Sequence, residues 1–216
     1  MKISEVKKEF PIFDEKIQNN DLVYLDSANS SQKPRIVVDR IYDFYTKEFS
    51  NVGRSVHYLA VAATNLYEQT RVSVQKYINA KDKDEIVFTK GATEAINLVA
   101  NTFGQKYLSE GDEVLLTELE HHSNYVPWHF LRKAKNIKIQ FAEINDDGEV
   151  TLEAIEKKIT NKTKIISVSH LSNVTGAILP IKEIVQLAHS KNIPVLIDGC
   201  QGAPHLKLDM QDIDCD

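Results

Sequence analysis

Apolar residues between positions 86 and 198 switch repeatedly between two spacings. Runs typical of buried strands occur at 86–89, 114–116, 165–168 and 194–198, and positions 137, 139 and 141 alternate as in a half-buried strand. Helical spacing predicts helices over 95–100, 126–134, 151–159 and 181–189. Strands that alternate with helices imply right-handed crossovers. The pattern predicts an α/β fold, with a mostly parallel sheet and helices on both faces.

Two more helices are predicted before the first strand. One lies between Pro34 and Phe49, where apolar residues recur near helical spacing and proline suits the helix start. The other covers 66–78 with one apolar and one polar face. Glu68 and Arg71 are placed to form an exposed ion pair on the polar face.

Composition narrows the class of protein. The 216 residues are 42% hydrophobic and 26% charged, which excludes collagen and low-complexity disorder. A net charge of −5 argues against a nucleic-acid binder. Two cysteines exclude a disulfide framework and a four-cysteine zinc site. The start has no apolar run of a signal peptide, and no membrane-spanning run follows, so a cytoplasmic location is expected.

Polar residues follow the strand predicted at 86–89. Ligands of parallel sheets bind beyond the carboxyl ends of strands. Gly91 and Thr93 lie between that strand and the next helix, where free backbone N–H groups and the helix dipole favour a phosphate. The alternative is an ordinary helix entry with Thr93 as its cap. The segment matches neither a Walker A loop nor GxGxxG.

Imidazoles and an amide follow two other strands. His121 and His122 come after the strand at 114–116, and His170 and Asn173 come after the strand at 165–168. An imidazole at this edge can stack on a ring, move protons or bind a metal. A solvated loop is the alternative. Against a metal site, no third ligand has a recognisable spacing.

Asp198 ends an apolar strand. Its carboxylate should be partly desolvated and needs a cationic or hydrogen-bonding partner. A protonated pyridine nitrogen is one such partner, and capping of the turn at 199–201 is the alternative. A phosphate cradle, an imidazole, an amide and this carboxylate together are the set that a pyridoxal phosphate site needs.

The sequence resembles the N-terminal portion of group II (Suf-type) cysteine desulfurases, in the class V aminotransferase family of fold-type I pyridoxal phosphate enzymes. The resemblance rests on ordered motifs at 24–28, 32–34, 91–100, 120–124, 126–128, 170–173 and 198–201. It implies an N-terminal arm over 1–30. Residues 31–216 would be the N-terminal part of the cofactor-binding large domain, incomplete at the C-terminus.

The resemblance also implies roles for individual residues. His121 would stack on the cofactor ring and assist proton transfer. Asp198 would pair with the pyridine nitrogen and Gln201 with the ring hydroxyl. The phosphate would be held by Thr93 and the backbone of Gly91 and Ala92, with Asn173 near the substrate carboxylate. The family converts L-cysteine to L-alanine and passes the sulfur, as a persulfide, to an acceptor protein for iron–sulfur cluster assembly, working as a homodimer.

Parts of the family's machinery are expected beyond the matched segment. In family members, the lysine that forms the Schiff base and the cysteine that accepts the sulfur both lie after the matched segment. The 216 residues alone are therefore expected to be inactive. Neither Cys200 nor Cys215 should take the cysteine's role, and both are expected to be buried in packing. Alternatives remain a truncated non-catalytic chain that binds cofactor or a partner, a selenocysteine lyase, and a metal hydrolase built on His121, His122 and Asp198.

Overall fold

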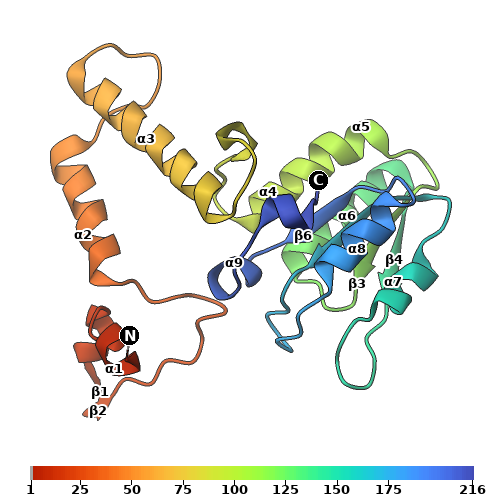
Figure 1. Ribbon diagram of the computed structural model, residues 1–216, viewed down its shortest axis with the longest axis horizontal. Helices are drawn as coiled ribbons and strands as arrows, with labels where there is room; N and C mark the ends of the chain where they lie inside the picture. Colours follow the sequence, from red (N-terminus) through yellow and green to blue (C-terminus); the bar gives the residue numbers. More distant parts are fainter. Residues whose placement is uncertain (1) are drawn as a thin grey trace. The chain divides into compact units, whose positions relative to one another are not determined.

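The computed structural model describes residues 2–216, which divide into two compact units (Figure 1). The first unit is Met1–Ser73 and the second is Val74–Asp216. The predicted boundary between an arm over 1–30 and a domain over 31–216 is a different division, and it stays a prediction.

The first unit is mainly helical. Its elements are α1 (Ile3–Lys7), the 3₁₀ helix η1 (Pro11–Asp14), the antiparallel pair β1 (Lys16–Ile17) and β2 (Asn20–Asp21), α2 (Arg35–Asp43), the π-helical η2 (Phe44–Glu48) and α3 (Tyr58–Tyr77), which continues into the second unit. Both predicted helices are confirmed, and Glu68 pairs with Arg71 at 3.6 Å. The β1–β2 hairpin was not predicted. Its turn places Gln18 and Asn19 at positive φ, the geometry of a tight two-residue hairpin.

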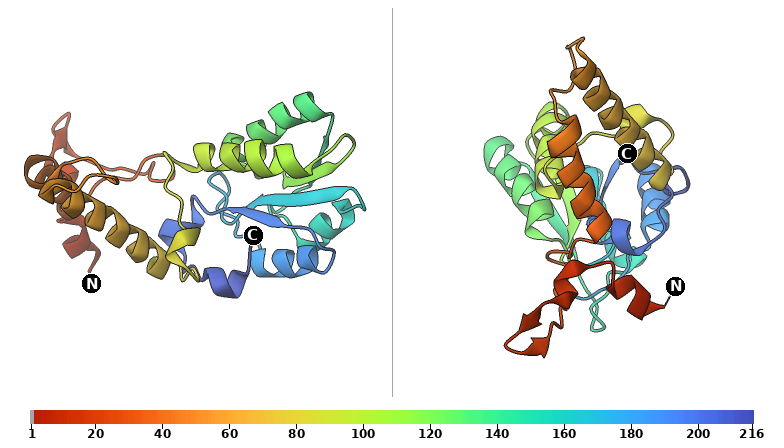
Figure 2. Two further views of the ribbon diagram at one scale, coloured as in Figure 1. Left: turned by 90° about the horizontal axis from the view of Figure 1, so that it is seen from above. Right: turned by 90° about the vertical axis from the view of Figure 1, so that its left-hand side faces the viewer.

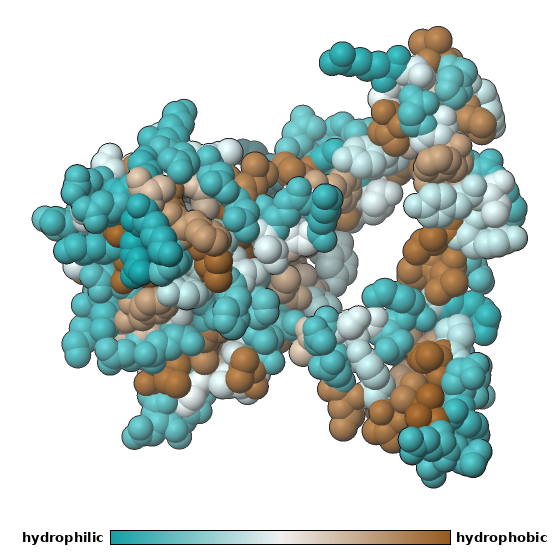
Figure 3. Space-filling model, turned by 180° about the vertical axis from the view of Figure 1, so that it is seen from behind, coloured by the Kyte–Doolittle hydropathy of each residue, from teal (hydrophilic) through white to brown (hydrophobic). Residues whose placement is uncertain are grey.

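Apolar side chains of the first unit are largely exposed. Figure 3 shows hydrophobic surface on it, and α2 and η2 contribute Ile36, Ile41 and Tyr45. Within α3 the buried residues are Ala60 and Ala63. The sequence gives α2 an amphipathic pattern, but the apolar face of this helix is not buried in the described residues.

The second unit contains a parallel four-stranded sheet in the order β4-β3-β5-β6. Its strands are β3 (Glu113–Thr117), β4 (Lys138–Ala142), β5 (Thr163–Ser169) and β6 (Val195–Asp198). These confirm four of the five predicted strands. The strand predicted at 86–89 is wrong: Ile86 is extended, but the segment belongs to neither sheet of the described residues. A short apolar run specifies burial, whereas strand pairing needs a neighbour that local sequence does not supply.

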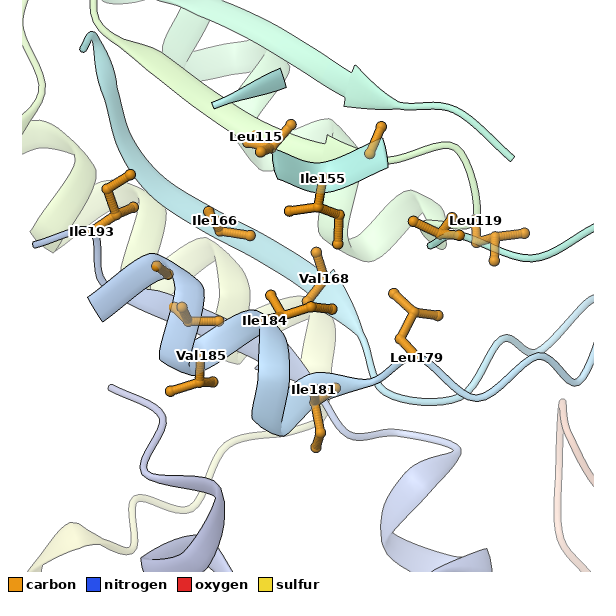
Figure 4. Packing of buried hydrophobic residues seen from close by; sticks show 14 of the residues in the cluster. Leu115, Leu119, Ile155, Ile166, Val168, Leu179, Ile181, Ile184, Val185 and Ile193 are labelled. Atoms are coloured by element: carbon orange, nitrogen blue, oxygen red, sulfur yellow. The ribbon is translucent and has the colours of Figure 1, made fainter. Parts of the chain in front are cut away.

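Helices cover both faces of this sheet, as predicted (Figure 2). On one face, Leu115 and Ile166 pack against Ile184 of α8 (Ile181–His189) and Ile155 of α7 (Leu152–Lys158) (Figure 4). On the other face, the buried residues of β3 and β5 pack against α4 (Ala92–Val99), η4 (Ala100–Gly104) and α6 (His122–Lys135). Adjacent strand residues point to opposite faces, which explains why consecutive residues such as Val114, Leu115 and Leu116 of β3 are all apolar and buried.

The remaining helices are short. They are η3 (Lys83–Glu85), α5 (Gln105–Tyr107), α9 (Gly202–His205) and α10 (Met210–Ile213). The α6 helix begins at His122, four residues before the predicted start at 126, because His121 acts as its N-cap. Within residues 2–216, no helix combines the length and the apolar character needed to cross a lipid bilayer.

Candidate active site

The carboxyl ends of β5 and β6 lie side by side. Ser169 and Asp198 are paired in register, and the backbone N–H of His170 donates to the carbonyl oxygen of Asp198 at 2.9 Å. Because β3 pairs with β5 on its other side, the segment after Thr117 reaches the same edge of the sheet. The topology therefore brings three of the predicted strand ends together.

Asp198 is a buried acidic residue, with 7% of its surface exposed. Its Oδ1 accepts a hydrogen bond from the backbone N–H of Cys200 at 3.0 Å. The carboxylate therefore caps the following turn, which was one of the two predicted roles. One backbone donor leaves a carboxylate further capacity to accept hydrogen bonds, so this contact is compatible with a cationic partner as well.

The start of α4 lies next to this turn. The backbone N–H of Ala92 lies close enough to the Cys200 sulfur to lower the pKa of this thiol. Gly91 is the N-cap of α4 at φ +157°, a conformation that L side chains rarely adopt, and the helix has no side-chain cap. The reading of Thr93 as a cap is therefore wrong. No heavy atom lies within 4 Å of the position of a β-carbon at Gly91 or Gly199, so space is open beside both backbones.

The two cysteines differ in environment. Cys200 is exposed, so the expectation of a buried residue is wrong, whereas Cys215 is partly buried and packs against the core cluster of β3, β5 and α8. Desolvation of its sulfur and the neighbouring Asp198 carboxylate raise the pKa of the Cys200 thiol. Because an ordinary thiol already titrates above neutral pH, Cys200 remains protonated and is a poor nucleophile there.

His121 is exposed and is the N-cap of α6. Its Nδ1 accepts from the backbone N–H of Ser123 at 3.2 Å and lies 2.8 Å from the Ser123 hydroxyl oxygen. These contacts assign the proton of the neutral ring to Nε2. The ring of His122 lies edge-on to it, with centroids 6.0 Å apart.

Glu120 is a residue of this edge that the sequence analysis did not single out. Its carboxylate accepts from Thr117, Asn124 and Ser169, which belong to β3, α6 and β5. Burial raises the pKa of this carboxyl although each of these hydrogen bonds opposes the shift. Glu120 and Asn124 are four residues apart at the start of a helix, and this spacing could have predicted the hydrogen bond between their side chains.

Asn173 and Gln201 complete the predicted set. Asn173 is exposed in a loop closed by an antiparallel bridge between Leu171 and Ile178. Gln201 is partly buried and is the N-cap of α9. The structure thus brings Ala92 near Cys200 of the Asp198 turn and places Gln201 in that turn. The Asn173 side chain makes no hydrogen bond to another member of the set within residues 2–216.

Metal-ligand geometry gives no support to the hydrolase alternative. Across the described part of the chain, no three His, Cys, Asp or Glu side chains are grouped to hold a metal ion. His121, His122 and Asp198 therefore do not form such a site.

Curated proteins similar to this chain include cysteine desulfurases. A probable cysteine desulfurase of Halalkalibacterium halodurans is 45% identical over 216 residues, which are 100% of this chain and 53% of the relative. A cysteine desulfurase of Synechococcus elongatus is 42% identical over 214 residues, covering 99% of this chain and 34% of the relative. The chain thus spans about half or less of the length of these relatives.

Solved structures agree with the fold. The apo cysteine desulfurase of Thermococcus onnurineus matches with a TM-score of 0.91 at 34% identity, over 100% of this chain and 52% of that chain. The cysteine desulfurase CsdA of Escherichia coli matches with a TM-score of 0.87 at 34% identity, over 100% of this chain and 53% of that chain. The fold is therefore that of the fold-type I enzymes, as predicted.

A family model also matches directly. The model of the class-V aminotransferases covers residues 23–216, nearly the whole chain. With the shared fold and the relatives above, this match shows that the chain belongs to the aminotransferase class-V family.

Proposed function

We propose that the full-length protein is a pyridoxal phosphate-dependent cysteine desulfurase. The observation that carries the proposal is that the α4 N-terminus lies beside the turn after the buried Asp198, with Ala92 near the Cys200 sulfur and open space beside Gly91 and Gly199. The names of the relatives support the reaction class. A more distant solved structure, 26% identical, is described as SspA in complex with cysteine.

The residues at this edge fit a cofactor with one anionic and one cationic end. The uncapped start of α4 offers backbone N–H groups and the positive end of a helix dipole, which suit a phosphate. The buried Asp198 carboxylate offers a negative charge, which suits a protonated pyridine nitrogen. The open space beside Gly91 and Gly199 leaves room for a ligand between these two charges.

Each predicted site residue then has one task. Gly91, Ala92 and Thr93 would hold the phosphate, Asp198 would keep the ring nitrogen protonated, and Gln201 would hydrogen-bond the ring hydroxyl. Asn173 would lie near the substrate carboxylate. The cofactor, when bound, withdraws electrons from the substrate and so weakens bonds at its α-carbon.

His121 is the candidate for proton transfer. Because Nδ1 accepts from Ser123, the ring presents Nε2–H away from the helix start. The neutral ring presents Nε2–H as a hydrogen-bond donor. To act as an acid it must first become an imidazolium, in which the Ser123 hydroxyl oxygen, 2.8 Å away, can accept from Nδ1–H, and the proton then given up is the one on Nε2. The engaged Nδ1 fixes which nitrogen exchanges the proton.

The reaction proposed is the conversion of L-cysteine to L-alanine, with the sulfur passed as a persulfide to an acceptor protein. We assign it to the group II, Suf-type subgroup, acting as a cytoplasmic homodimer that supplies iron–sulfur cluster assembly. These assignments concern the whole protein, of whose relatives the present chain spans about half.

The test uses the full-length protein with added pyridoxal phosphate, L-cysteine and dithiothreitol, which reduces the persulfide and releases its outer sulfur as sulfide, and it measures sulfide and alanine together. Equal amounts of both products in a cofactor-dependent reaction are expected. Cofactor binding without either product would overturn the desulfurase assignment and favour a non-catalytic binding role. Faster turnover of selenocysteine than of cysteine would instead indicate a selenocysteine lyase.

A further inference from the structure

The Glu120 carboxylate lies at the junction of β3, β5 and α6. Its Oε1 accepts from the Thr117 hydroxyl at 2.6 Å and from the backbone N–H of Ser169 at 3.0 Å. Its Oε2 accepts from the Ser169 hydroxyl at 2.7 Å and from Asn124 Nδ2 at 2.6 Å. Each carboxylate oxygen therefore faces one hydroxyl, which can rotate, and one N–H donor.

Neither N–H donor can turn away. The Ser169 N–H is part of the backbone at the end of β5. The Asn124 amide is fully buried, and its Oδ1 accepts from the Ser167 hydroxyl at 2.5 Å and from the indole N–H of Trp128 at 3.3 Å. Rotating this amide would face its NH₂ group toward the indole N–H of Trp128, which can only donate, and would lose a buried hydrogen bond.

Position 120 therefore requires an acceptor at both terminal atoms of its side chain. An ionised carboxylate meets this requirement. Glutamine has nearly the same shape, yet its NH₂ group would oppose the Ser169 N–H in one orientation and Asn124 Nδ2 in the other. The environment thus distinguishes a carboxyl from an amide group without relying on size.

The same contacts reach His121. Its carbonyl oxygen accepts from the backbone N–H of Asn124 at 2.8 Å, while the Asn124 side chain donates to Glu120. The first turn of α6 is thereby tied to the end of β5, and Ser169 is paired in register with Asp198. Displacing Asn124 would move the helix start that holds the His121 ring through the Ser123 N–H.

We propose that Glu120 is a positioning residue for His121, which fixes the place and tautomer of its imidazole by joining the first turn of α6 to the ends of β3 and β5. Glu120 acts through Asn124 and Ser169 and does not itself contact the reacting groups. The catalytic consequence rests on the proposed function, whereas the effect on the His121 ring does not.

The test compares Glu120→Gln with Glu118→Gln in the full-length protein. Glu118 is a matched control, because it is an exposed carboxylate on the same loop that accepts a single backbone N–H, that of Ile144, at 3.0 Å. The first readout is the ¹⁵N NMR spectrum of the His121 imidazole, assigned by its loss in His121→Gln. The second is kcat for sulfide release.

In wild type and Glu118→Gln, the His121 spectrum is expected to show Nε2 protonated and Nδ1 accepting. In Glu120→Gln it should move toward an average of both tautomers, and kcat should fall about tenfold, the effect of losing about 1.4 kcal/mol of transition-state stabilisation. Ser169→Ala removes only one rotatable donor. It should give a smaller change in the same direction, which keeps the test available if Glu120→Gln does not fold.

Unchanged His121 spectra in both Glu120→Gln and Ser169→Ala would overturn the proposal, even with reduced stability. An equal change in the His121 spectrum of Glu118→Gln would also overturn the proposal. It would show that loss of any carboxylate charge on this loop alters the His121 ring, without the specific contacts of Glu120. An altered spectrum in Glu120→Gln, in a protein whose wild type releases no sulfide, would uphold the positioning role and reject the desulfurase activity alone.

Discussion

The imidazole of His170 lies against the α-carbon of Gly202. A β-carbon at position 202 would lie 2.7 Å from His170 Nδ1 and 3.0 Å from its Cγ. Both residues are buried. The contact joins the segment after β5 to the first residue of α9, beside the turn that follows Asp198.

Gly202→Ala should therefore destabilise the protein. The methyl group would have to displace a buried ring, and overpacking of this kind costs roughly 1–3 kcal/mol. The free energy of unfolding, measured by urea denaturation, checks this. Gly199→Ala is the control, since nothing lies within 4 Å of its β-carbon position, and an equal loss in both variants would contradict the explanation.

His170 should make stability depend on pH. Burial lowers its pKa from the ordinary value of 6.5, so the unfolded chain binds the proton more readily than the folded one. The stabilisation is complete above pH 6.5 and is lost as the pH falls toward the lower pKa of the folded protein. His170→Gln should show a smaller fall in unfolding free energy between about pH 7.5 and about pH 5. Parallel pH curves for wild type and variant would show that His170 is not responsible.

Asp198→Asn should weaken cofactor binding more than it weakens the fold. The asparagine Oδ1 can still accept the Cys200 N–H, but the negative charge toward a protonated pyridine nitrogen is gone. A charge-assisted hydrogen bond contributes about 1.5–3 kcal/mol, so the Kd for pyridoxal phosphate should rise roughly 10- to 100-fold.

Titration of the full-length protein by cofactor absorbance measures this Kd, with circular dichroism as the control for folding. An unchanged Kd would remove Asp198 from the proposed site. Unfolding of Asp198→Asn, seen by circular dichroism, would instead indicate that Asp198 serves to stabilise the turn at 199–201.

Thr151 should contribute to stability as the N-cap of α7. Its hydroxyl oxygen accepts from the backbone N–H of Ala154 at 3.2 Å, as its position before the helix predicted. Thr151→Ala should cost about 1 kcal/mol of unfolding free energy, and Thr151→Ser should restore most of it. Equal stability of the alanine and serine variants would show that the cap contributes nothing.

Local sequence predicted much of the second unit correctly. Helix α8 matches the expected range of 181–189, and Pro180 precedes it as expected. Strand β6 has the expected apolar run, with Asp198 at its end. These elements were predictable because their burial pattern and their start and stop signals lie within a few residues of one another.

Three expectations failed where a side-chain contact or a distant partner, and not the apolar pattern, decided the outcome. The segment at 86–89 does not join the sheet, and α6 starts four residues before the predicted position because the His121 side chain caps it. Cys200 lies exposed between the Asp198 turn and the start of α4, where interior packing was expected. Each outcome depends on contacts between segments that are remote in sequence or on side-chain geometry.

The sequence by itself determined the alternation of strands and helices, the parallel sheet and the family. Hydrophobic periodicity and ordered motifs depend on residues that are close together in the sequence. Only the tertiary structure decided the strand order β4-β3-β5-β6 and the partners of Glu120. Periodicity states which side of a strand is buried, but not which strand lies next to it. The carboxylate at position 120 acquires its four donors only when β3, β5 and α6 meet.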